Sequence, residues 1–167
     1  MTVTSVRKDP ETLTMTITAE LDATVERAWQ LWADPRQLER WWGPPTYPAT
    51  VVDHELVAGG RVTYFMTGSD GDKAHGWWQV LAAGPPHRLE IRDGFADDSG
   101  APNDSMPTTT FVVTLTDRDG GGTVMAIETR FPSLEAMEQL AAMGMEEGIT
   151  AALSQIDAIL GEDVTSR

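Results

Sequence analysis

Hydrophobic and polar residues alternate strictly in residues 12–21, which read TLTMTITAEL. Leu13, Met15 and Ile17 fall on one face, and threonines fall on the other. This period of two, with many β-branched residues, predicts a strand that has one buried and one solvated face.

The spacing changes to that of a helix in residues 23–33. An apolar stripe with the spacing i, i+3, i+4 and i+7 consists of Val25, Ala28, Trp29 and Trp32. A second short helix is predicted from Pro35, with Asp34 as its N-cap and Gln37 completing a capping box. It ends before Gly43, which two prolines follow.

Alternation then returns and predicts six further strands separated by turn residues. They fall in residues 49–56, 61–67, 75–83, 87–95, 108–116 and 123–131. The dipeptides Asp70-Gly71 and Asp119-Gly120 lie between alternating runs, which is typical of hairpins.

The C-terminal part predicts one long helix over residues 134–160, capped by Ser133 and ended by Gly161. At about 1.5 Å per residue it would span about 40 Å. The chain is therefore expected to be α+β, with two short helices between the first and second of seven antiparallel strands. We expect a single domain over residues 1–167, with an ordered core at about 12–160.

Composition narrows the possible partners. The chain has 12 basic and 26 acidic residues, a net charge of −14, and no cysteine. Nucleic acid is therefore not expected as a partner, since binding it needs clustered Lys and Arg. The sequence offers neither a secretory signal nor a stretch long enough for a membrane span, so we expect a cytoplasmic protein.

Six segments in register resemble one known family. They read RAWQLWADPRQLERWWGP, DHELVAGGR, HGWWQV, PPHRL, GGGTVMAIETRFPS and GMEEGITAALSQIDAIL. The chain resembles the activator-of-heat-shock-ATPase-homologue-like branch of the START/Bet-v superfamily, also called SRPBCC domains, over residues 12–160. The resemblance implies a helix-grip fold, in which a curved sheet wraps around the long helix and leaves an apolar cavity. It implies little about chemistry, because the family includes binding proteins, co-chaperones and more distant cyclases.

A set of inward-facing residues is expected around this cavity, with Tyr64, Asp93 and Thr109 as polar anchors. The set consists of Trp42, Tyr64, Met66, one of Trp77 and Trp78, Ile91, Asp93, Phe95, Thr109, Phe111, Val113, Met145, Ile149 and Leu153.

Two tryptophan pairs carry open alternatives. Trp41 is expected in the core, whereas Trp42 either packs there too or covers the entrance of the cavity. Trp77 and Trp78 lie in one strand, so one faces the helix and the other faces away. A tight turn would pair Tyr64 with Trp77, but a one-residue change would reverse both orientations. The outward tryptophan is a candidate homodimer contact.

Gly144 and Gly148 lie four residues apart in the long predicted helix, where glycine is unfavourable. They allow either a close approach of helix and sheet or room for a ligand. The nearby Met143 and Met145 are flexible side chains that suit a promiscuous apolar pocket.

Candidates for catalysis are few. Asp93 shares an inward face with Ile91 and could act as an acid or base if buried. The plainer alternative is an ion pair with Arg61 or Arg92, or a local strand bend at Gly94. His54 is the second candidate, and the other histidines, His75 and His87, are expected at the surface. The three histidines lack metal-ligand spacing. We predict no catalytic residue, metal or cofactor.

The leading hypothesis is a protein that binds a hydrophobic or aromatic small molecule between its sheet and its C-terminal helix. The second is a stress-related or co-chaperone-like interaction module, with an apolar patch around Trp42 or the outward tryptophan. The third is a cyclase or hydrolase that uses the same cavity.

Overall fold

A computed structural model of the chain describes residues 2–165. The strands are β1 (Thr2–Asp9), β2 (Thr14–Leu21), β3 (Ala49–His54), β4 (Arg61–Thr67), β5 (Lys73–Gly84), β6 (Arg88–Ala96), β7 (Thr109–Asp117) and β8 (Thr123–Arg130). The helices are α1 (Val25–Ala33), α2 (Pro35–Trp41), α3 (Leu134–Ala142), α4 (Met145–Leu153) and α5 (Ile156–Thr165). No helix of this described part is long and apolar enough to cross a membrane.

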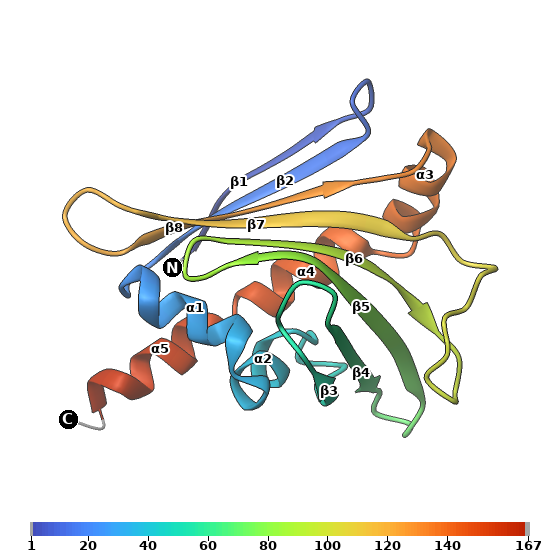
Figure 1. Ribbon diagram of the computed structural model, residues 1–167, viewed down its shortest axis with the longest axis horizontal. Coiled ribbons are helices and arrows are strands. Elements are labelled where there is room, and N and C mark those ends of the chain that lie inside the picture. Colours follow the sequence, from blue (N-terminus) through green and yellow to red (C-terminus); the bar gives the residue numbers. More distant parts are fainter. Residues whose placement is uncertain (1, 166–167) are drawn as a thin grey trace.

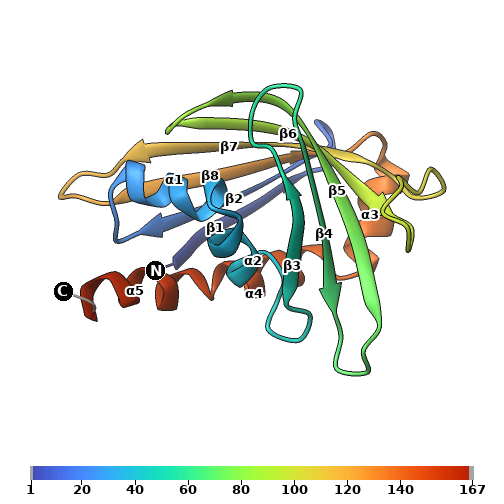
Figure 2. The ribbon, with the colours of Figure 1, turned by 60° about the horizontal axis from the view of Figure 1, so that its bottom comes forward.

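All eight strands of the described residues form one antiparallel sheet, in the order β1-β2-β8-β7-β6-β5-β4-β3 (Figure 1). The sheet arches over α4 and α5, and β3, β4 and β5 bend down toward these helices at one end (Figure 2). The short helices α1 and α2 connect β2 to β3, and α1 contacts β7. This is the expected α+β arrangement of a curved antiparallel sheet and C-terminal helices.

The prediction of seven strands was wrong, because the N-terminal segment forms an additional edge strand. β1 pairs with β2 along its length, but the register shifts between Val3 and Ser5. This irregularity interrupts the alternation, and Arg7, Lys8 and Asp9 are exposed. A bulged edge strand with charged residues lacks the period-two pattern that identifies strands in a sequence.

The prediction of a single long C-terminal helix was also wrong. Gly144 adopts φ = +85°, a left-handed conformation that ends α3 and begins α4. A second interruption at Ser154 separates α4 from α5. Gly161 does not end the helix, since α5 continues to Thr165. The apolar stripe continues across the breaks, so periodicity did not reveal them.

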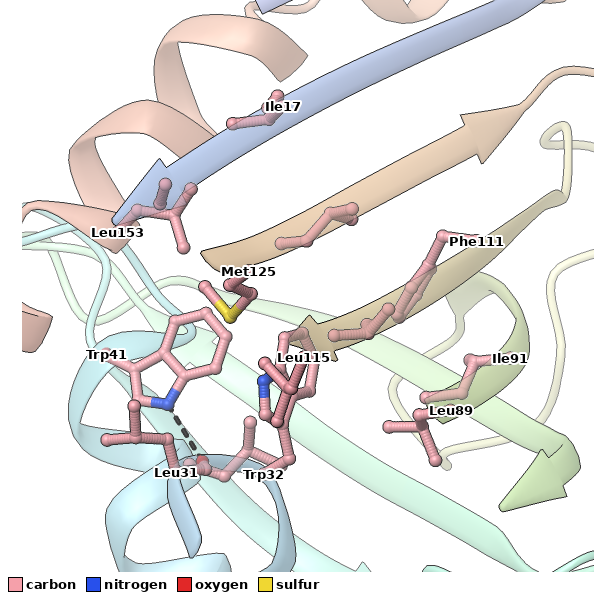
Figure 3. Packing of buried hydrophobic residues seen from close by; sticks show 14 of the residues in the cluster. Ile17, Leu31, Trp32, Trp41, Leu89, Ile91, Phe111, Leu115, Met125 and Leu153 are labelled. Carbon is pink, nitrogen blue, oxygen red and sulfur yellow. Dashed lines mark hydrogen bonds between the residues drawn. The ribbon is translucent and has the colours of Figure 1, made fainter. Parts of the chain in front are cut away.

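The short helices follow the predicted local signals. Asp34 caps α2, because its side chain accepts from the backbone N–H of Arg36 and from the Gln37 amide. Trp41 is buried and donates from Nε1 to the Leu31 carbonyl at 2.9 Å, which joins the two helices (Figure 3). These helices therefore anchor the chain next to the cavity described below.

Candidate functional site

A cavity of about 350 Å³ lies between the sheet and the helices α3 and α4. Strands β4 to β8, the end of α2 and the loop after it also contribute to its wall. Most of the lining side chains are apolar or aromatic. Ligand sites for small molecules typically enclose about 300–1,000 Å³ and have walls of this kind.

Nine residues of the predicted set lie on this wall. They are Trp42, Tyr64, Met66, Asp93, Phe95, Thr109, Phe111, Met145 and Ile149. Strand alternation and helix periodicity thus placed these side chains on the correct face. Their role in ligand binding remains a prediction.

Four predicted residues lie in the solid core instead: Trp78, Ile91, Val113 and Leu153. All four are fully buried and none of them lines the cavity. Figure 3 shows Ile91 and Leu153 among these packed side chains. Alternation identifies the inward face of a strand, but it does not tell where packing ends and open space begins.

The strand register settles the orientation of the second tryptophan pair. Five residues separate β4 from β5, and Tyr64 pairs with Gly76 rather than with Trp77. Trp78 consequently points inward and is fully buried. Trp77 lies on the other face and donates from Nε1 to the Phe95 carbonyl at 3.0 Å. The tight turn that would have paired Trp77 with Tyr64 does not form.

Trp42 lies in an aromatic cluster at the cavity wall and is half-buried. Its ring centroid is 4.8 Å from that of Trp78, 6.0 Å from Phe111 and 6.1 Å from Tyr64. Trp32 and Trp41 lie at 6.0 and 5.6 Å. Trp42 is therefore part of the wall rather than a cover over the entrance.

The backbone after α2 holds Trp42 in this position. A Cβ atom on Gly43 would come within 2.1 Å of the Tyr47 carbonyl oxygen, so only glycine fits this close turn. Gln155, between α4 and α5, donates from its side-chain amide to the Gly43 carbonyl at 2.7 Å. The glycine that follows the two tryptophans thus couples the end of α2 to the C-terminal helices.

Gly148 explains part of the open space. A Cβ atom built on Gly148 would have nothing within 4 Å, and the residue lines the cavity. Of the two predicted explanations for this glycine, the structure agrees with room above the helix and not with a close approach. Glycine occurs at position 144 for a different reason, since the backbone there adopts a left-handed conformation that favours glycine.

Asp93 provides the carboxylate of the cavity. It pairs with Thr109 across β6 and β7, and the Thr109 hydroxyl donates to its Oδ1 atom. Burial raises the pKa of Asp93 to about 6, although the Thr109 hydrogen bond opposes this shift. The predicted ion pair does not form, because Arg61 contacts Asp53 at 3.7 Å and Arg92 lies over the Trp77 ring.

Tyr64 is the second polar group at this end of the cavity. Burial raises the pKa of its hydroxyl well above the usual value, and the negative charge of Asp93 raises it further. The indole N–H groups of Trp42 and Trp78 act in the opposite direction, but neither makes a hydrogen bond of good geometry. Tyr64 therefore stays protonated, and its hydroxyl can donate a hydrogen bond to a bound molecule.

Two lining residues outside the predicted set, Met143 and Gly148, belong to the helix segment that the sequence had offered as room for a ligand. The remaining lining residues were not predicted; they are Trp41, Pro44, Tyr47, Ala74, His75, Gly76, Gly94, Pro107, Ile127, Thr129, Leu140 and Ala152. Once Trp78 is known to face inward, alternation along β5 places Gly76 and Ala74 on the same face. His75, expected at the surface, is half-buried.

The other two histidines make structural hydrogen bonds. The Nε2 atom of His54 lies 2.9 Å from the Trp32 carbonyl oxygen, and Nδ1 of His87 lies 2.9 Å from that of Leu115. Neither residue lines the cavity. Within residues 2–165, no three acidic or histidine side chains converge in a way that could hold a metal ion.

A hydrogen bond joins two loops beside the cavity. The Tyr47 hydroxyl, from the loop after α2, donates to Asp72 Oδ2 at 2.8 Å in the turn between β4 and β5. Met143, which directly follows α3, lines the cavity and is 54% exposed. The cavity therefore reaches the surface near the break between α3 and α4.

Comparison with protein families agrees with this geometry. The family model described as Activator of Hsp90 ATPase homolog 1-like protein matches residues 22–161, which is most of the chain. The chain belongs to this family. The resemblance inferred from the six sequence segments is thereby confirmed.

Solved structures similar to this family member cover nearly all of it. Protein Ms6760 from Mycobacterium smegmatis is 53% identical, with 95% of this chain and 96% of that chain covered and a TM-score of 0.87. A protein from Arthrobacter aurescens is also 53% identical, with 96% and 93% covered and a TM-score of 0.92. The AHSA1 protein from Silicibacter pomeroyi, 19% identical with 90% and 99% covered and a TM-score of 0.72, shares the fold. None of the curated proteins compared with the chain matches it.

Proposed function

We propose that this protein binds a hydrophobic or aromatic small molecule in the cavity between the sheet and α4. The observation that carries the proposal is the unfilled space of about 350 Å³ above Gly148, walled by aromatic side chains. Protein interiors are normally packed to the density of organic crystals, so a space of this size needs a reason. A bound apolar molecule would fill it and bury the surrounding rings.

Titration with Nile red, a neutral dye that fluoresces in apolar surroundings, tests the proposal together with a thermal-shift measurement. We expect saturable binding and a melting temperature that rises with dye concentration, because a ligand of the folded state stabilises it. Gly148→Leu should weaken both effects, because its side chain would take up part of the cavity. The control Gly161→Leu places the same side chain on α5, outside the cavity, and should bind like the wild type. Equal binding by Gly148→Leu and the wild type would place the dye elsewhere and contradict the proposal.

Proton transfer on the bound molecule is a second candidate function, favoured by the position of Asp93. Its carboxylate lines the cavity and has a pKa of about 6. A general base works best when its pKa lies near the pH at which the protein operates. The Tyr64 hydroxyl nearby could donate a hydrogen bond to a carbonyl oxygen of the substrate. Any isomerase or cyclase activity found should fall at least about a hundredfold in Asp93→Asn. An activity that survives this change would exclude Asp93 as the base.

The interaction module receives less support, because both expected centres of its apolar patch are occupied. Trp42 contacts other rings in the cavity wall. Trp77 lies under the Arg92 guanidinium, with its N–H bonded to a backbone carbonyl. A homodimer through the outer sheet face likewise remains a prediction, which light scattering after size exclusion would check.

A further inference from the structure

The cavity contains a carboxylate without a cationic partner. Asp93 accepts a hydrogen bond from Thr109, and no lysine or arginine is found among the described residues that line the cavity. Besides Asp93, the titratable lining residues are Tyr47, Tyr64 and His75. Arg92, adjacent in sequence, is exposed and lies 5.9 Å from the Trp77 ring on the outer face.

The walls around this carboxylate also favour positive charge. The faces of aromatic rings carry partial negative charge and attract cations within about 6 Å of the ring centre, most strongly for tryptophan. Such rings are supplied by Trp42, directly after α2, by Tyr64 of β4 and by Phe111 of β7. The net charge of −14 further raises the local concentration of cations and lowers that of anions.

We infer that the cavity binds a hydrophobic organic cation, with a protonated amine directed at the Asp93 carboxylate and an apolar body against the aromatic wall. This inference rests on the proposed binding function and specifies the class of ligand. An ammonium group would donate a hydrogen bond to Oδ2, the carboxylate oxygen that Thr109 leaves free. A carboxylic acid of the same shape would instead bring a second negative charge beside Asp93, which is unfavourable in a cavity of low polarity.

Three probes that share one apolar body test the inference. They are 2-naphthylmethylamine, 2-naphthylmethanol and 2-naphthoate, which are positive, neutral and negative at pH 7.5. Isothermal titration calorimetry measures the affinity of each. Both the amine and the alcohol can donate a hydrogen bond to the carboxylate, but only the amine adds an opposite charge. The amine should therefore bind at least about tenfold more tightly than the alcohol. The acid should bind more weakly than the alcohol.

Two variants test whether Asp93 causes the preference for the amine over the alcohol. In Asp93→Asn, the ratio between the affinities of the amine and the alcohol should fall to about one. The control Asp98→Asn removes the same charge from an exposed loop and should keep the wild-type ratio. A ratio that stays unchanged in Asp93→Asn would refute the inference.

Failure of the inference can be distinguished from failure of the proposed function. If the alcohol or the acid binds as tightly as the amine, the cavity binds apolar molecules but the inference is wrong. If none of the naphthalene probes binds while Nile red still binds, the inference is wrong and the binding function stands. If Nile red fails as well, both are wrong.

Discussion

Replacing Asp93 by asparagine is expected to stabilise the protein at neutral pH. The carboxyl has a pKa of about 6 in the folded protein, against a pKa of 3.8 for an aspartate in the unfolded chain. Between these two pH values the folded protein holds a proton that the unfolded chain has released. Stability therefore falls as the pH rises from 3.8 to 6, and this loss persists at higher pH.

The size of the loss follows from the difference between the two pKa values. Each pH unit corresponds to about 1.4 kcal/mol, so the difference between 6 and 3.8 gives at most about 3 kcal/mol. Asp93 is only half-buried and its cavity reaches the surface, so water screens the charge and about 1–2 kcal/mol is expected. The asparagine oxygen can still accept the Thr109 hydrogen bond, so the variant removes the charge and keeps this contact.

Urea denaturation of Asp93→Asn and the wild type between pH 4 and pH 8 measures the effect. The variant should be more stable by about 1–2 kcal/mol at pH 7.5, and the gain should shrink as the pH falls through 6. The control Asp98→Asn corrects for the general benefit of removing one negative charge from an acidic protein. A variant less stable than the wild type at pH 7.5, or a gain that does not depend on pH, would refute the reasoning.

Three further substitutions follow from the packing. Gly148→Leu should raise the free energy of unfolding by about 1 kcal/mol or more, because leucine has a higher helix propensity and its side chain takes up empty space. The control Gly161→Leu should gain from helix propensity alone, and urea denaturation compares the two variants. Gly76→Ala would place a Cβ atom 2.4 Å from the Tyr64 ring, so a loss of about 1–3 kcal/mol is expected in the same assay. Trp41→Phe should cost about 2–3 kcal/mol, since a fully buried ring shrinks and its hydrogen bond to a backbone carbonyl is lost. A loss below about 0.5 kcal/mol, which is the usual scatter of surface substitutions, would contradict this account.

The predictable parts of the fold are those that local signals determine. The Thr14–Leu21 strand alternates in burial as its sequence alternates, and the cap at Asp34 forms from residues within one turn. The edge strand β1 escaped detection because its bulge breaks the alternation. The break at Gly144 escaped because a left-handed residue can interrupt a helix without disturbing the apolar stripe.

The sequence predicted which side of each strand faces the candidate site, but not how far the cavity extends. Alternation along β6 placed Asp93 and Phe95 inward, and both line the cavity. The same alternation placed Ile91 inward, where it lies in solid core. The direction of Trp78 depended on the length of one turn, which the sequence left open. Packing between distant elements decides where the cavity ends, and a local pattern contains no information about it.

Three features that weaken this protein meet at one place. Gly148 leaves space empty in a helix, Asp93 holds a carboxylate at a raised pKa, and Trp42 leaves a buried N–H without a partner. Each cost could be removed by an ordinary substitution, and all three residues line the same cavity. Costs to stability that are scattered are expected in any fold, whereas costs that converge are typical of sites kept open for a ligand. A molecule that fills the space, donates to the carboxylate and accepts a hydrogen bond from the Trp42 N–H would offset all three at once.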